Sequence, residues 1–248
     1  MTILEAAQAL TDALQLSQRP VGMAFTDTIP AGVPAYSGLV PAGCRFWQEA
    51  TQRVFATVPR DHELCAVGVY THHMVQTEGV QSDLQDALRV FGELQYVRPE
   101  DIAFIPVLER EAKVVVYGPL DSIPVAPDVV LLFVRADQTL ILTEASQQVE
   151  GGLPPVMGRP ACAIVPQAVN IGRTALSLGC CGARAYLDTL TPETALFAIP
   201  GSKLEVFAER VEALAKANTL LTRFHSIRRT TVEAGEHPSV SETLAAMA

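Results

Sequence analysis

Residues 113–134 read KVVVYGPLDSIPVAPDVVLLFV, and this stretch decides the fold class. Two apolar runs rich in β-branched residues, 113–117 and 128–134, flank a segment rich in proline. β-Branched side chains favour strands, and short apolar runs bounded by turn residues are typical of buried strands. We therefore predict that both runs are central strands of a sheet.

The rest of the chain alternates between amphipathic segments and short apolar runs, which predicts a mixture of helices and strands. The mixture predicts an α/β fold around a mixed sheet, with an α+β fold as the alternative. The predicted helices are 3–16, 45–53, 82–94, 140–150 and 203–217, and the further strands are 21–25, 54–58, 161–165 and 196–199.

Two segments of the sequence resemble one another. Residues 19–25, RPVGMAF, are similar to residues 159–165, RPACAIV, and each segment is followed by a loop and then a cysteine. Chance similarity is the alternative to a true repeat. We predict one compact domain over 1–232 with two related halves, about 17–118 and 157–228, and a loosely ordered tail over 233–248. Related halves would bring their cysteine turns to one cleft.

The composition limits the partners. The net charge of −9 argues against nucleic acid, which requires clustered Lys and Arg. The apolar run 129–134 is far shorter than the roughly 20 residues that span a bilayer, and the first residues lack the basic stretch of a secretory signal. We expect a cytoplasmic protein that acts on a small molecule and does not bind a membrane. A homo-oligomer is compatible with the sequence.

Five cysteines without an export signal predict inert core residues, metal ligands or reactive thiols rather than disulfides. Cys180 and Cys181 lie between Gly179 and Gly182, and glycine permits a close approach of a ligand to the backbone. If residues from Ala183 onward are helical, the exposed N–H groups there lower a thiol pKa. A tight turn with two buried cysteines is the structural alternative.

The other cysteines and the histidines give weaker signals. Cys44 precedes Arg45 at the end of a loop rich in glycine and proline, where it is either a thiolate or a buried anchor. Cys65 follows His62 by three residues, a spacing that puts both on one face of a helical turn. His72 and His73 are adjacent, so at most one of them serves a site on a strand. Cys162 lies within the predicted strand 161–165 and is interpreted as a core residue.

These cysteine turns resemble the domain-of-unknown-function 169 family, an uncharacterised archaeal and bacterial group sometimes labelled ArCR. The resemblance covers roughly residues 3–228 and rests on the segments 43–47, 65–70 and 177–186. It implies that Cys44, Cys65 and the Cys180–Cys181 turn form the cysteine set of the family. It implies no activity.

The leading hypothesis is a metal or iron–sulfur site, with redox or small-molecule chemistry in a cleft between the halves. Soft thiolates select an iron–sulfur cluster or zinc. The expected ligands are Cys44, Cys65, Cys180 and His62, and the residues expected to hold the bound group are Arg45, Gly179, Gly182 and Arg184. A thiol enzyme without a cofactor, with Cys181 as nucleophile and His72 as base, is one alternative. A non-enzymatic protein that binds a small anionic ligand or cofactor is the other.

Overall fold

Strand β4 (Val129–Arg135) lies at the centre of the sheet in the computed structural model, which describes residues 1–247. Its side chains alternate between two cores: Leu131 and Phe133 pack on one face, and Leu132 and Val134 pack on the other. A strand that is buried on both faces is apolar along its whole length, as the sequence of β4 is. The predicted strand 128–134 is confirmed.

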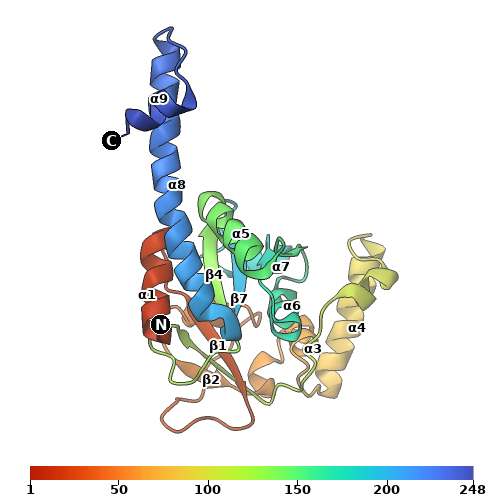
Figure 1. Cartoon of the computed structure of the whole chain (residues 1–248). Coiled ribbons are helices and arrows are strands. Elements are labelled where there is room, and N and C mark those ends of the chain that lie inside the picture. Colours follow the sequence, from red (N-terminus) through yellow and green to blue (C-terminus); the bar gives the residue numbers. More distant parts are fainter. Residues whose placement is uncertain (248) are drawn as a thin grey trace.

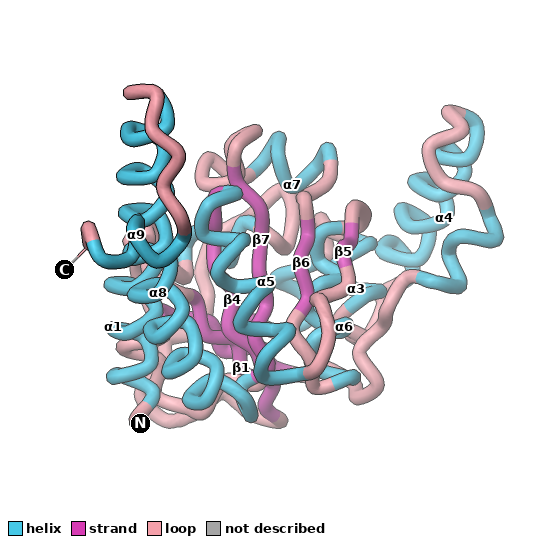
Figure 2. Tube along the Cα trace, turned by 45° about the horizontal axis from the view of Figure 1, so that its top comes forward, coloured by secondary structure: helices cyan, strands magenta, loops and turns pink. Residues whose placement is uncertain are grey.

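The described residues form a seven-stranded mixed sheet in the order β2-β3-β1-β4-β7-β6-β5 (Figures 1 and 2). Neighbouring strands are antiparallel except for β5 and β6, which are parallel. In the register, Met23 lies opposite Tyr117 and Leu131 lies opposite Ala198. The other strands are β1 (Val21–Thr26), β2 (Phe55–Thr57), β3 (Val114–Pro119), β5 (Val156–Met157), β6 (Ala175–Ser177) and β7 (Thr194–Pro200).

Helices cover both faces of the sheet. The long helices pack on one face: α1 (Ile3–Leu14), α5 (Ala136–Glu150) and α8 (Leu204–Glu233). Short helices pack on the other face: α2 (Arg45–Glu49), α3 (Ala66–Thr71), α6 (Ile164–Ile171) and α7 (Cys181–Tyr186). The remaining helices are α4 (Glu78–Glu93), α9 (Val240–Ala245) and the 3-10 turns η1 (Pro59–His62), η2 (Pro99–Phe104), η3 (Ala161–Ala163) and η4 (Gly201–Lys203).

Two helical segments project from this body. Helix α4 extends away from the sheet on the side of the short helices, and the second half of α8 extends beyond the sheet with α9 alongside it (Figure 1). The buried residues of α8 all lie in its first eight positions, from Leu204 to Val211. Helix α8 is therefore anchored by its first two turns. No helix in residues 1–247 combines the length and the apolar character that a membrane crossing requires.

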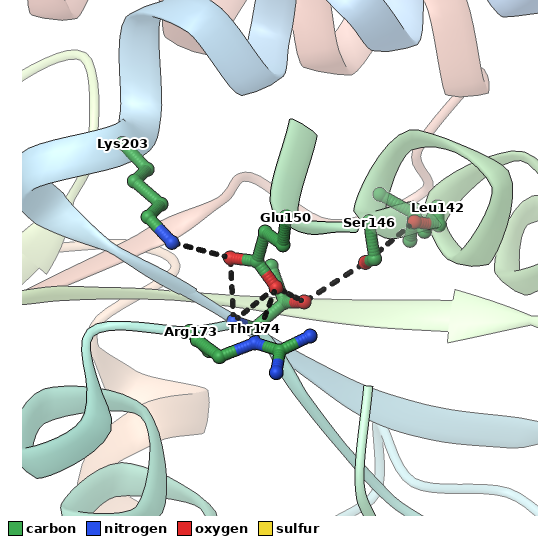
Figure 3. Close-up of polar contacts among 6 residues, drawn as sticks. All are labelled: Leu142, Ser146, Glu150, Arg173, Thr174 and Lys203. Carbon is green, nitrogen blue, oxygen red and sulfur yellow. Dashed lines mark hydrogen bonds and ion pairs between the residues drawn. The ribbon is translucent and has the colours of Figure 1, made fainter. Parts of the chain in front are cut away.

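A buried carboxylate joins three elements at one end of the sheet (Figure 3). The Glu150 side chain, 1 % exposed, accepts hydrogen bonds from the backbone N–H of Thr174 at 3.0 Å and from its hydroxyl at 2.8 Å. Lys203 Nζ lies 3.2 Å from the same carboxylate. A buried charge requires such partners, so this cluster ties the end of α5 to the start of β6 and of α8.

The sequence prediction is wrong at residues 161–165. These residues form η3 and the start of α6, not a strand. Pro160 and Pro166 flank the run, and α6 buries Ile164, Val165 and Ala168 at helical spacing against the sheet. Residues 21–25 do form a strand, so the two similar segments differ in structure, and the sheet does not show the predicted repeat.

Candidate cysteine site

Four cysteines lie at the beginnings of short helices on one face of the sheet. Cys44, Cys65 and Cys180 each immediately precede a helix, namely α2, α3 and α7. Cys162 lies in η3, which leads into α6. All four pack against the same hydrophobic core. The fold thus gathers thiols from four separate segments of the chain on one side of the sheet.

The four thiols are close enough to affect one another electrostatically. Burial raises the pKa of the Cys44 thiol to about 12, and the neighbouring Cys65 and Cys180 thiols raise it further. Burial also raises the pKa of Cys162 well above its usual value, with Cys65, Cys180 and Cys44 acting in the same direction. The pKa values of Cys44 and Cys162 are therefore raised first by burial and then by other thiols of this group.

Two glycines make room for the Cys65 sulfur. A β-carbon at Gly68 would lie 2.9 Å from Cys65 Sγ, and one at Gly43 would lie 3.8 Å from it. Burial raises the pKa of Cys65, whereas hydrogen bonds from the backbone N–H groups of Gly43 and Gly68 act against this rise. The backbone at these two glycines therefore lies close to this sulfur.

Two buried polar groups near the thiols have no hydrogen-bond partner within residues 1–247. The hydroxyl of Tyr117 is one, and burial followed by the Cys65 thiol raises its pKa. The other is Nε2 of His72, whose Nδ1 lies 2.9 Å from the carbonyl oxygen of Gly68. Buried polar atoms are normally satisfied, and these two are exceptions among the described residues.

His62 lies beside the cysteines with its ring already engaged. Its Nε2 is 2.8 Å from the Thr57 hydroxyl, and a β-carbon at Gly43 would lie 3.2 Å from its Nδ1. Burial, followed by the nearby His72, lowers the pKa of His62 to about 3, so the ring is neutral. The His62 ring supports the loop that carries Cys44.

Cys162 lies in a turn and not in the predicted strand, and its thiol is 3.3 Å from the Thr71 hydroxyl. It packs against the core, as its interpretation as a core residue expects. The sequence did not include it among the candidate ligands. The local sequence offers little signal against a strand here, since β1 likewise follows a proline, Pro20.

The residues expected to hold a bound group have structural partners instead. The Arg45 guanidinium lies 3.1 Å from the carbonyl oxygen of Tyr186 and 3.2 Å from the Asp188 carboxylate. Arg184 donates to the carbonyl oxygens of Leu178 and of the segment 190–194. Both arginines therefore hold the loops around α7 in place. Gly179 has φ +80°, a conformation that favours glycine, and Gly182 is the second residue of α7.

Cys181 and His72 are not brought together as a nucleophile and its base. Cys181 is exposed, and its sulfur accepts a hydrogen bond from the Tyr96 hydroxyl at 3.5 Å. His72 is buried at the end of α3, and no hydrogen bond joins it to Cys181 in the part of the chain that the structure describes. The two adjacent cysteines have separate environments, since Cys180 packs on the core.

Sites for a single metal ion and sites for an iron–sulfur cluster differ in how closely their ligands converge. Among the described residues, no three His, Cys, Asp or Glu side chains are grouped closely enough to hold a single metal ion. Ligands of one zinc ion converge to about 2.3 Å from it, whereas thiolates that bind a multi-iron cluster are spaced around a larger group.

The fold and the site define a mixed α/β protein with four thiols gathered on one face of its sheet. The chain belongs to the DUF169 family, described as uncharacterised ArCR, whose sequence model matches residues 9–210. No curated protein and no solved structure matches the chain. The matched range contains all five cysteines and ends within the first third of α8.

Proposed function

We propose that this protein binds an iron–sulfur cluster through the thiolates of Cys44, Cys65, Cys162 and Cys180 and uses it in redox or small-molecule chemistry. The observation that carries the proposal is the convergence of these four thiols, from four segments, on one part of the core. Four thiolates are the usual ligand set of [2Fe–2S] and [4Fe–4S] clusters. Cys162 replaces His62, which the sequence favoured as the fourth ligand.

The ligand chemistry is that of an iron–sulfur cluster, since all four proposed ligands are thiolates. The donors around the thiols also suit a cluster, whose properties depend on hydrogen bonds to its sulfurs. The backbone at Gly43 and Gly68 lies close to the Cys65 sulfur. The Tyr117 hydroxyl has no hydrogen-bond partner within residues 1–247, and its pKa is raised by burial and by the thiols of Cys65, Cys162 and Cys44.

The residues around the thiols would keep water away from most of the site. Cys44 is buried and belongs to a core cluster that includes Phe46, Trp47 and Phe55, whereas Cys180 is partly exposed and precedes the exposed Cys181. A small molecule would therefore approach from the side of α7. When bound, the cluster would supply one-electron chemistry or an iron atom that binds a substrate.

The test is metal analysis of protein purified without oxygen. We expect iron and acid-labile sulfide close to stoichiometry. Separate substitutions Cys44→Ser, Cys65→Ser, Cys162→Ser and Cys180→Ser should each remove most of the iron. Cys181→Ser is the matched control, because it removes the adjacent thiol outside the ligand set and should retain the iron.

Three results would contradict this proposal. One equivalent of zinc without sulfide would support a mononuclear site. Retention of iron in Cys162→Ser together with its loss in His62→Ala would restore His62 as the fourth ligand. A metal-free protein whose thiols are rapidly alkylated would favour thiol chemistry without a cofactor.

A further inference from the structure

Three exposed or half-exposed side chains from distant segments meet outside the thiol group. Cys181 is the first residue of α7, Tyr96 follows α4, and Arg159 precedes η3. The Tyr96 hydroxyl donates to Cys181 Sγ at 3.5 Å, and the Arg159 guanidinium lies 3.6 Å from the centre of the Tyr96 ring. Nη1 of Arg159 also donates a hydrogen bond to the carbonyl oxygen of Tyr96 at 2.5 Å. Tyr96 therefore holds a thiol at one end of its side chain and a cation against its ring.

The positive charge of Arg159 is not neutralised by an ion pair. No carboxylate of residues 1–247 lies within 4.0 Å of its guanidinium. Arg98 donates to the Asp101 carboxylate through Nε at 2.9 Å and Nη2 at 2.6 Å. Arg98 is the main cause of the lowered pKa of Asp101, and Arg159 adds to it. The guanidinium thus retains donors and charge for an anion, and arginine binds carboxylates through paired hydrogen bonds.

We propose that Arg159, Tyr96 and Cys181 form a binding site for a small molecule that carries a carboxylate, held so that its reactive carbon faces the Cys181 sulfur. Arg159 binds the carboxylate, and Tyr96 positions both the guanidinium and the thiol. Cys181 is the nucleophile of a substitution at the carbon beside the carboxylate: the sulfur–carbon bond forms, the bond from that carbon to its leaving group breaks, the leaving group departs with the electron pair, and the thiol proton passes to solvent. This site goes beyond the cluster proposed above and does not require it, because Cys181 lies outside the four ligands.

Alkylation of Cys181 with two matched reagents tests the site. Iodoacetate carries a carboxylate, and iodoacetamide is its neutral counterpart of nearly equal size. In both reactions the Cys181 sulfur forms a bond to the methylene carbon, the carbon–iodine bond breaks, iodide leaves with the electron pair, and the thiol proton passes to solvent. The label on Cys181 is followed over time by fragment-ion mass spectrometry of the full-length protein as purified.

Arg159→Gln should lower the rate with iodoacetate about threefold and leave the rate with iodoacetamide unchanged, as expected for one partly exposed charge pair. The effect should shrink in 0.5 M NaCl because salt screens the pair. Arg159→Lys should retain most of the preference for iodoacetate, and Tyr96→Leu should reduce it because the guanidinium loses its support. Arg135→Gln, which removes an equal charge at the end of β4, is the matched control and should behave as the parent protein does.

Equal loss of both rates in Arg159→Gln would overturn the proposal, because Arg159 would then act on the thiol alone. Unchanged rates in Arg159→Gln would overturn it as well. An equal effect of Arg135→Gln would also overturn it, because the change in rate would then come from the net charge of the protein alone. Iron content, measured on the same variants, separates this proposal from the cluster. Arg159→Gln should retain its iron whether or not the alkylation result holds.

Discussion

The Thr71 hydroxyl lies 3.3 Å from the sulfur of Cys162 and 3.2 Å from the carbonyl oxygen of Gly68. Thr71 is the last residue of α3 and is fully buried, so its hydroxyl links the helix that follows Cys65 to the turn that carries Cys162. This contact joins two of the proposed ligand segments, which are almost a hundred residues apart in the sequence.

We expect Thr71→Val to lower the free energy of unfolding by about 1 kcal/mol, the usual value of one hydrogen bond. In the iron-loaded protein it should also lower the reduction potential, because a hydrogen bond to a cluster thiolate favours the more negative reduced state. Denaturant unfolding and a redox titration measure the two effects. Thr51→Val is the control, since the buried Thr51 hydroxyl donates to the Gln48 carbonyl instead of a sulfur. An equal shift of potential in both variants would contradict the role of Thr71.

Gly68→Ala should displace the Cys65 sulfur, because the added β-carbon would lie 2.9 Å from it. We expect iron content to fall by more than half. Stability of the metal-free protein should change little, since alanine in a helix is favoured over glycine by about 0.5–1 kcal/mol. Gly92→Ala in α4 is the matched control, because its β-carbon would meet no atom closer than 4.0 Å. Full iron content in Gly68→Ala would show that iron binding does not depend on the present position of the Cys65 sulfur.

Glu150→Ala should lower the free energy of unfolding by about 2–4 kcal/mol, because the change leaves Thr174 and Lys203 without their buried acceptor. The fall in Tm in a thermal scan measures this loss of stability. Glu144→Ala, an exposed position on the same helix, should stay within about 0.5 kcal/mol of the parent protein. Comparable losses in the two variants would mean that the burial of the Glu150 carboxylate does not decide the effect.

The central sheet could be predicted because its strands carry their signal locally. Residues 114–117 and 129–134 are continuously apolar, and such runs have one stable location, between two layers of helices. The run 161–165 carries the same local signal but becomes helical, and α6 buries Ile164, Val165 and Ala168 against the sheet. Short apolar runs are ambiguous until their packing is known.

The sequence singled out three of the four cysteines of the candidate site. Glycine-rich turns marked Cys44 and Cys180, and the spacing from His62 marked Cys65; all three pack against one core cluster. Cys162 was interpreted as a core residue of a strand, and the strand is wrong. The contacts among Tyr96, Arg159 and Cys181 depend on how three loops pack over long distances in the chain, and no spacing in the sequence encodes such a meeting.

The projecting part of α8 should be dispensable for the core. The predicted helix ended at residue 217, but α8 continues to Glu233. Its later residues are mostly exposed, and Thr243 of α9 is the buried residue of the segment that packs alongside it. This part lacks the apolar stripe by which helices are recognised in a sequence.

A variant that ends at residue 217 retains Leu204, Phe207, Ala208 and Val211, the residues by which α8 packs on the sheet. We expect its Tm to lie within about 4 °C of the parent protein, the shift that roughly 1 kcal/mol produces in a chain of this size. Iron content should be unchanged. A variant that ends at residue 203 is the control and should not fold, because it exposes the apolar surface that α8 covers. Loss of solubility or of iron in the longer variant would show that α9 and the outer half of α8 stabilise the body of the protein.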